Sequence, residues 1–383
     1  MLCIVIFLLI TWKNKNLDAR KTIICIMVFL AFFIRGAYEQ KTNTSHLNNI
    51  ENKNFEVLVS DKIDVNGNYM SGIGYINNEK VLINYIVKNE DEKRFFREKF
   101  WGGKLVVNAT IDDIPSKTNF YSFDYKKYNE NRGVFKKVTI NNLYRVENVD
   151  SFGFKLLTYR NLLSLKIDRE LTFDKSGYFQ ALIFGDKSYL QRDDVSAFKN
   201  LGTSHLLAIS GLHIGVLISL IYFILLKLNI SVNIIEKIIL IIIPIYILLS
   251  GASASVLRAG FMIILYILFR RKNIDKLGSL LLTLLILLMV NPMFIFNIGF
   301  QLSFLITFCL LMSGRFIKDS KNKFQGAFRI SLISTLASFP ILLYNFGTIV
   351  YISVFSNIVL VPVFSILIFP LVLVSYVIFL ISS

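Results

Sequence analysis

The sequence predicts a polytopic α-helical membrane protein with an inserted small extracytoplasmic β-barrel domain. Hydrophobic residues make up 54% of the 383 residues and the mean hydropathy is +0.56, which is too apolar for an ordinary soluble chain. Long apolar blocks fill the second half of the chain, whereas residues 50–146 consist of short β-branched runs separated by turn residues. The chain therefore combines several membrane spans with one separate soluble part.

Residues 1–38 are expected to form an N-terminal transmembrane hairpin. Its apolar segments, 1–10 and 22–38, flank a short basic stretch that the positive-inside rule places in the cytoplasm. The first segment is shorter than the roughly 20 residues of a full span, and a signal peptide is the competing interpretation. The hairpin is favoured because no basic residue precedes the first segment and a second apolar segment follows at once.

Residues 39–150 are expected to form an extracytoplasmic β domain. Five partly alternating, β-branched runs separated by Gly, Asn and Asp predict a small antiparallel barrel. The runs are FEVLVS (55–60), YMSGIGYI (69–76), KVLINYIV (80–87), KLVVNATIDDI (104–114) and KKVTINNLYRV (136–146). The hairpin leaves the membrane on its outer side at Tyr38, which places this domain outside the cytoplasm. The next segment, 151–203, predicts amphipathic helices along the membrane surface, because leucines alternate there with Lys and Arg.

Residues 204–383 are expected to form a transmembrane channel domain. Its apolar blocks are 205–226, 234–250, 253–269, 277–290, 297–314, 330–345 and 350–381. The loops that carry Lys or Arg all fall on one side of the membrane, and the intervening turns at 250–253, 291–296 and 346–349 carry none. The basic loops are therefore predicted to be cytoplasmic. The last block is longer than one span and contains two prolines, which predicts a broken or double helix.

The first of these blocks contains the stretch GTSHLLAISGLHIG (202–215), whose polar residues need an explanation. Placed on one helix, Gly211, Gly215 and Ser219 form a packing face for a neighbouring helix. His205, Ser210 and His213 fall on a second arc. They either hydrogen-bond to nearby backbone at the outer interface or line an aqueous path. A second stretch, GASASVLRAG (251–260) at the start of the third block, repeats the small-residue spacing at Gly251 and Ser255.

Arg258 lies about one and a half turns inside its predicted span, where a lone Arg is costly unless it is hydrated or paired. After His205 the chain has only three acidic residues, Glu236, Asp275 and Asp319, all in or beside predicted cytoplasmic loops. A path lined by Arg, His, Ser and amides without carboxylates suits an anion. Further candidates for this path, each of which alone has the alternative role of a helix-packing residue, are Gln301, Ser303, Asn345 and Asn357.

Four motifs in order, HLLAISGLHIG, SGASASVLRAGFM, NPMFIFNIGFQLSF and SNIVLVPVFS, resemble the signatures of the ComEC family of bacterial DNA-uptake proteins. SFDYKKYNENRGV (122–134) resembles the end of that family's extracytoplasmic OB-like domain, and ALIFGDKSYL (181–190) its pre-membrane helix. The resemblance implies a multi-pass protein of the bacterial cytoplasmic membrane that passes single-stranded DNA during natural transformation. It also implies a separate DNA receptor, while self-association into a homo-oligomer is left open.

The stretch NFYSFDYKKY (119–128) predicts weak single-stranded DNA binding by the β domain. It interleaves aromatic side chains suited to base stacking with basic ones, a combination typical of sequence-tolerant strand binding. The candidates are Phe123, Tyr125, Lys126, Lys127 and Tyr128. The alternative is that Phe123 and Tyr125 are core residues, which the near balance of 25 basic and 22 acidic residues over 39–204 allows.

The sequence predicts no catalytic residue, metal site or cofactor. It contains no GxxxxGK[ST] motif, so a separate cytoplasmic helicase or ATPase would drive transport. A metallo-β-lactamase-like domain, present in many ComEC proteins, has no counterpart here, so we expect a nuclease on another polypeptide. Two other functions remain as alternatives. One is a small-molecule or ion permease, and the other is an intramembrane serine protease that pairs Ser253 or Ser255 with His205 or His213.

Overall fold

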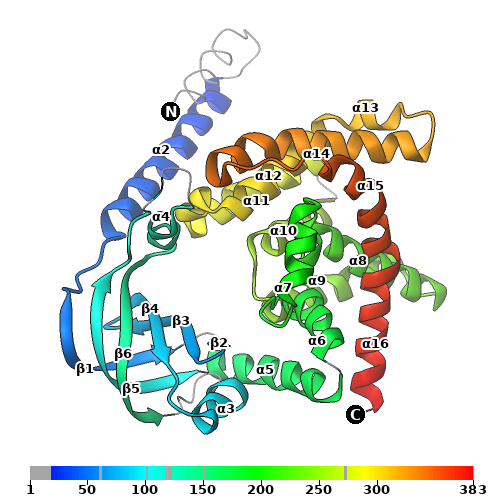
Figure 1. Cartoon of the computed structure of the whole chain (residues 1–383). Coiled ribbons are helices and arrows are strands. Elements are labelled where there is room, and N and C mark those ends of the chain that lie inside the picture. The colour runs from blue at the N-terminus through cyan, green and yellow to red at the C-terminus, as the bar shows by residue number, and fades with distance from the viewer. Residues whose placement is uncertain are drawn as a thin grey trace.

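The computed structural model describes residues 19–59, 63–100, 102–117, 119, 123–147, 149, 152–171, 173–270 and 274–382. The protein is mostly helical with one small sheet domain, and Figure 1 shows the strands gathered at one side of the helices. Helix α2 (Ala19–Thr42) precedes the sheet and α5 (Phe152–Glu170) follows it. The first segment of the predicted hairpin, 1–10, lies outside the described residues, and the second lies within α2.

Six strands form the sheet in the order β1-β5-β6-β4-β3-β2. Their bounds are β1 (Ile50–Val59), β2 (Asp64–Asn66), β3 (Tyr69–Ile76), β4 (Glu79–Ile86), β5 (Gly103–Asp113) and β6 (Val134–Glu147). The five predicted runs are confirmed as β1, β3, β4, β5 and β6. Sequence patterns did not predict β2 or helix α3 (Glu90–Glu98), although Asn89 caps α3 by accepting from the Glu92 N–H, which is a recognisable start signal.

The pairing between the strands differs from the predicted one at a single place. Strands β4 and β6 pair in parallel, from Lys80↔Val134 to Tyr85↔Ile140, whereas the other pairs are antiparallel. The prediction that all strand pairs are antiparallel was therefore wrong for this pair. Strand β5 lies between β4 and β6 in the chain and runs opposite to both of them, so β4 and β6 run in the same direction. Strand β1 also pairs with β3 through Leu58↔Tyr75 and Val59↔Gly74, which links strands near the two ends of the sheet.

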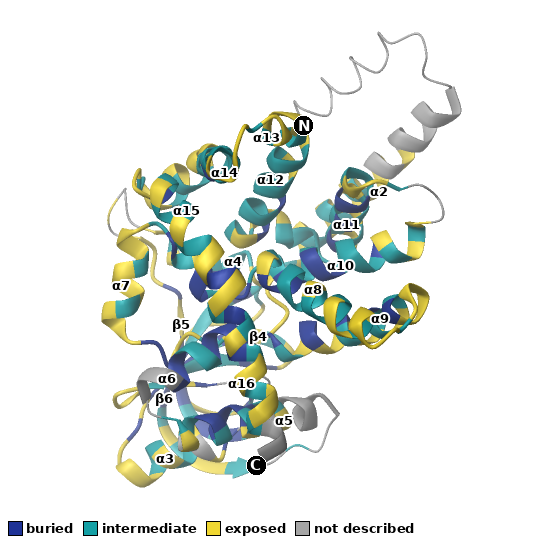
Figure 2. Cartoon of the chain, turned by 90° about the vertical axis from the view of Figure 1, so that its right-hand side faces the viewer, coloured by how far each residue is buried: buried dark blue, intermediate teal, exposed yellow. Residues whose placement is uncertain are grey.

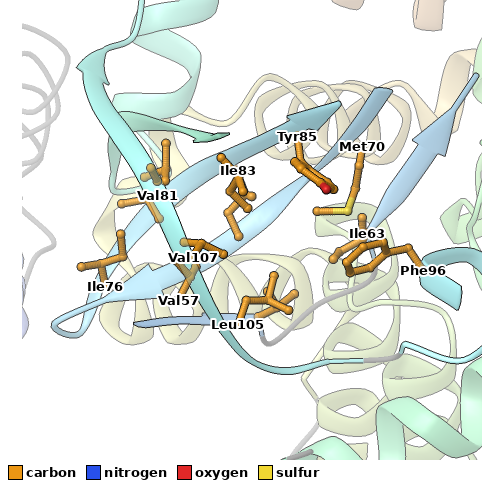
Figure 3. Packing of buried hydrophobic residues seen from close by; sticks show 14 of the residues in the cluster. Val57, Ile63, Met70, Ile76, Val81, Ile83, Tyr85, Phe96, Leu105 and Val107 are labelled. Atoms are coloured by element: carbon orange, nitrogen blue, oxygen red, sulfur yellow. The ribbon is translucent and has the colours of Figure 1, made fainter. Parts of the chain in front are cut away.

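One hydrophobic core holds the sheet domain together. Every second residue of β5 points inward, and Leu105, Val107 and Ala109 are fully buried. Figure 3 shows side chains from several strands meeting there, with Phe96 of α3 beside them. This period of two is what a strand produces when one face is buried, and it explains why these runs were predictable.

After the sheet domain, the chain continues with α5, α6 (Phe173–Phe179), a π-helical turn η1 (Gln180–Phe184) and α7 (Arg192–Asn200). Within the segment predicted to lie along the membrane surface, the five residues of η1 are all buried in the protein. Phe184 packs with Phe369 in one core cluster. The Gln180 side chain is satisfied in this core, since it donates to the Ser164 backbone oxygen and accepts from the Ser164 hydroxyl, both at 2.7 Å.

The second half of the chain consists of apolar helices. Their bounds are α8 (Gly211–Lys227), α9 (Val232–Leu249), α10 (Ala254–Phe269), α11 (Lys276–Val290), α12 (Ile298–Met312), α13 (Gly314–Lys318), α14 (Lys323–Phe346), α15 (Ser353–Pro362) and α16 (Phe369–Ser382). Three of the described helices are long and apolar enough to cross a membrane: α9, α14 and the path from Ser353 to Phe379. Figure 2 shows exposed positions along these helices. Among them, Ile241, Leu336 and Ile366 are 62–77% exposed. Such exposed apolar surface is typical of contact with lipid.

The predicted break in the last block is a π-helical segment. Helix α15 continues through η5 (Val363–Ile368) into α16 without reversing, so the interpretation as two helices was wrong. Pro362 lies at the end of α15 and lacks a backbone N–H, which explains why the hydrogen-bond pattern changes there.

Candidate functional site

Arg258 lies in the second turn of α10. Gly251 and Ala252 adopt positive φ angles of 76° and 49° in the tight turn after α9, and Ser253 is the N-cap residue of α10. The small residues before Arg258 therefore form the tight turn after α9 and the first helical turn of α10. This local geometry places the guanidinium near the beginning of α10, as its sequence position predicted.

Three helices meet at the Arg258 side chain. Its Nε donates to the hydroxyl of Ser303 on α12 at 2.7 Å. Its Nη2 lies against Gly211, the first residue of α8, so closely that a Cβ on Gly211 would be 2.2 Å away. Arg258 thus joins the beginnings of α8 and α12 to α10, and a glycine is needed for this approach.

The charge around Arg258 is not balanced by a carboxylate among the described residues. Glu236 pairs with Arg270, Asp275 caps α11 by accepting from the Gly278 N–H, and Asp319 is the C-cap residue of α13. The first turn of α8 adds the partial positive charge of a helix N-terminus beside the guanidinium. A cation and a helix N-terminus without a counter-ion form a favourable environment for a phosphate.

His205, Ser210 and His213 do not lie on one helix, so the predicted polar arc was wrong. His205 belongs to a separate 3-10 turn, η2 (Ser204–Leu207), and is exposed, while Ser210 is the N-cap of α8. The chain is extended at Ala208 between these elements. The apolar pattern runs through this break, which is why the sequence did not reveal it.

His213, in the first turn of α8, takes part in capping the N-terminus of that helix. Its Nδ1 accepts from the Ser210 N–H at 3.0 Å and lies 3.2 Å from the Ser210 hydroxyl. The ring is fully buried against Phe369, with centroids 4.6 Å apart, and Nε2 has no hydrogen-bond partner in the described part of the chain. Since Nδ1 accepts, the proton of the neutral ring lies on Nε2. His213 therefore combines a capping role with one unpaired donor.

The serine protease alternative finds no support in this geometry. A catalytic dyad needs a serine hydroxyl within hydrogen-bond reach of a histidine that a third group orients. Neither Ser253 nor Ser255 hydrogen-bonds to a histidine within the described ranges, and the contact between Ser210 and His213 is a local cap.

The predicted small-residue packing positions have different surroundings. Gly211 lies against Arg258, whereas a Cβ on Gly215 would touch nothing within 4 Å. Ser219 is exposed and bonds to the Gly215 backbone oxygen. These three positions line an open groove beside η5, so Gly215 and Ser219 do not form the expected helix contact. In the second motif, Ser255 is partly buried in α10 and Gly251 faces the guanidinium of Arg160 on α5.

The remaining predicted path residues are spread over α12, α14 and α15. Gln301 donates to the Ile295 backbone oxygen at 2.7 Å, and Asn345 donates to that of Ile341 at 2.8 Å. Asn357 has a buried side-chain oxygen without a partner in the described chain. None of the three hydrogen-bonds to Arg258 among the described residues. The structure therefore brings together Arg258, Ser303 and Gly211, and leaves the three amides apart.

The predicted DNA-binding residues of the β domain surround helix α4 (Tyr125–Glu130). Phe123 precedes the helix, and Tyr125, Lys126, Lys127 and Tyr128 belong to it. Asp124 caps it by accepting from the Lys127 N–H at 3.0 Å. Phe123 and Tyr125 are 36% and 44% exposed and belong to none of the core clusters, so the alternative of core residues was wrong.

Sequence reasoning missed two residues that link separate parts of the fold. Arg160 donates to the Phe184 backbone oxygen at 2.6 Å and faces Gly251, so it ties α5 to the α9–α10 turn. Phe346, the last residue of α14, stacks on Phe123. The sequence did not single out Arg160, because it is one of several Lys and Arg residues in the amphipathic segment 151–203. Phe346 could not be found from local sequence, because its partner lies in another domain.

Known proteins match most of this chain in sequence. The family model described as "Competence protein" matches residues 182–383. ComE operon protein 3 of Bacillus subtilis is 29% identical over 369 residues, which cover 96% of this chain and 47% of that protein. Recombination protein 2 of Haemophilus influenzae is 24% identical over 316 residues, or 74% of this chain and 39% of that protein. The chain thus spans less than half the length of these relatives. No solved structure matches it.

Proposed function

Since the chain belongs to the competence protein family, the ComEC family, we propose that it conducts single-stranded DNA across the bacterial cytoplasmic membrane during natural transformation. The apolar helices of its second half would span the membrane several times. The protein would act as a channel rather than as an enzyme. A separate DNA receptor, a nuclease and a cytoplasmic helicase or ATPase would work with it.

The observation that carries this proposal is the environment of Arg258. Its guanidinium has one neutral partner, Ser303, among the described residues and lies beside the N-terminus of α8. An Arg at the centre of a span costs about 2.5 to 3.5 kcal/mol on insertion scales, which is an upper value for Arg258 in the second turn of α10. A residue that only packed helices together would not need that charge. A passing phosphate would compensate the positive charge of Arg258 and would accept hydrogen bonds from the two terminal nitrogens of its guanidinium group.

The β domain fits an OB-like barrel outside the cytoplasm. The contact between β1 and β3 supports a closed arrangement, since each of the five longer strands then pairs with two others. Helix α3 lies between β4 and β5 in the chain, and the exposed aromatic and basic residues of α4 supply the strand-binding chemistry. In this proposal the domain receives the strand and the helices conduct it.

Replacement of Arg258 tests the channel. We expect Arg258→Ala to insert normally but to lower the transformation frequency by about 10- to 100-fold, because a buried charge-assisted contact contributes about 1.5 to 3 kcal/mol at each phosphate that passes. Arg258→Lys should retain part of the activity, since Lys keeps the charge but loses the two-pronged geometry. Both variants are compared at equal membrane abundance.

Arg270→Ala is the matched control. It removes the same charge from the other end of α10, where Arg270 pairs with Glu236. It should transform nearly as well as the wild type. Normal transformation by Arg258→Ala, at wild-type abundance in the membrane, would show that Arg258 does not contact the transported strand.

A further inference from the structure

Two aromatic rings from distant parts of the chain stack on each other where the β domain meets the membrane helices. Phe123 and Phe346 have ring centroids 5.7 Å apart and planes inclined by only 8°. Figure 1 shows α4 close to the helices at the top of the molecule. Phe346 ends α14, and Gly347 turns the chain away with a φ of 62°. The contact therefore lies at the junction of the two parts.

The aromatic contacts continue into the β domain. Phe123 lies 5.4 Å from Tyr128 with planes inclined by 57°, and Tyr128 lies 6.4 Å from Tyr125 with planes inclined by 26°. The guanidinium of Arg132 lies over the Tyr128 ring at 5.3 Å. We call Phe346, Phe123, Tyr128 and Tyr125 the junction rings. They form a row of aromatic surfaces from the membrane helices onto α4.

The junction rings are not a hydrophobic core. Phe123, Tyr125 and Phe346 are 36%, 44% and 43% exposed, and the buried residue of α4 is Asn129, which donates to the Tyr125 backbone oxygen. The surrounding segment 117–132 carries four basic and two acidic residues. Exposed aromatic faces with a surplus of positive charge are the chemistry that binds single-stranded nucleic acid.

We propose that the junction rings are a base-stacking site that transfers single-stranded DNA from the β domain to the membrane helices. Phe123 and Phe346 are already nearly parallel, so a base can stack on either ring or enter between them after a small separation. The proposal rests on the proposed function and adds Phe346 to the site. With uptake as proposed, the strand would pass from Tyr125 and Tyr128 through Phe123 to Phe346.

Leucine and tryptophan substitutions separate base stacking from simple adhesion between the two parts. Phe123→Leu and Phe346→Leu keep an apolar contact but lose the aromatic face, whereas Phe123→Trp and Phe346→Trp keep it. The full chain, purified in detergent, is irradiated with an oligothymidylate that carries 5-iodo-deoxyuridine. Crosslink yield and transformation frequency are measured at equal membrane abundance. Tyr144→Leu is the matched control, because Tyr144 is 58% exposed near the opposite end of β6.

We expect each leucine variant to lose about tenfold in crosslink yield and transformation, as befits the loss of one stacked base. The tryptophan variants and Tyr144→Leu should stay near the wild type. Equal losses in the leucine and tryptophan variants would overturn the inference, because the rings would then only hold the two parts together. Wild-type behaviour of the leucine variants would also overturn it, while loss of transformation in Arg258→Ala would leave the proposed function intact.

Discussion

At the scale of single residues, the contact between Arg258 and Gly211 decides what the site can do. The sequence identified both residues but assigned them to different roles, one to the path and one to helix packing. Their contact joins α10 to α8, and no local pattern encodes it. The glycine is required by the arginine, since any side chain at position 211 would occupy the space of the guanidinium.

Gly211→Ala should displace the Arg258 side chain without unfolding the protein. The new Cβ would lie 2.2 Å from Nη2, which is the end of a flexible side chain and can move. We expect normal membrane abundance with transformation lowered about tenfold, because the charge moves away from the helix N-terminus.

Gly215→Ala provides the comparison, since nothing lies within 4 Å of its added Cβ. It should transform like the wild type. Equal activity of the two alanine variants would mean that the position of the guanidinium against α8 does not matter.

At the scale of elements, strands were more predictable than helix beginnings. Strand β5 alternates buried and exposed residues along its length, and that period is visible in the sequence. The beginning of α8 was not visible, because apolar residues continue through the break before Ser210. The capping box there uses His213 where Glu or Gln is usual, so the ordinary signal was absent.

Strand β3 offers a test of the contact with β1. Gly74 pairs with Val59, and a Cβ on Gly74 would lie 2.4 Å from Ile83 Cδ1 and 2.9 Å from Val57 Cγ1. We expect Gly74→Ala to destabilise the sheet domain by about 1 to 3 kcal/mol through overpacking. Proteolysis of the full chain in membrane vesicles at rising temperature should show earlier cleavage between residues 50 and 147.

Ser71→Ala, on the outer face of the same strand, should leave the cleavage temperature unchanged. If Gly74→Ala were as resistant as the wild type, the space between β1, β3 and β4 would have to be looser than the structure shows.

At the scale of the whole molecule, the apolar blocks predicted where the helices lie, because long hydrophobic runs report burial in lipid or protein. They could not predict which blocks touch. The distribution of Lys and Arg adds an orientation: it predicts that the α13–α14 loop is cytoplasmic and the α14–α15 turn is outside. The contact of Phe346, just before that turn, with the β domain agrees with this assignment.

Cysteine labelling of intact cells tests the orientation. In a variant with Cys3, Cys25 and Cys309 replaced by serine, Tyr351→Cys should react with a membrane-impermeant maleimide, because Tyr351 is 77% exposed in the α14–α15 turn, which is predicted to be outside. Lys321→Cys, in the basic loop, should react only after the cells are permeabilised. Reaction of Lys321→Cys in intact cells would reverse the predicted topology.

The β domain is attached to helices at both of its ends. Seven residues separate Thr42 of α2 from Ile50 of β1, and four separate Glu147 of β6 from Phe152 of α5. Asn43 in the first connector also donates to the Glu130 backbone oxygen at 3.2 Å. Two short tethers confine whatever the domain holds to a small volume, so its effective concentration at the helices reaches about the millimolar range. Under the proposed function, weak affinity is then sufficient to capture the strand, and it would allow each nucleotide to be released as the next one arrives.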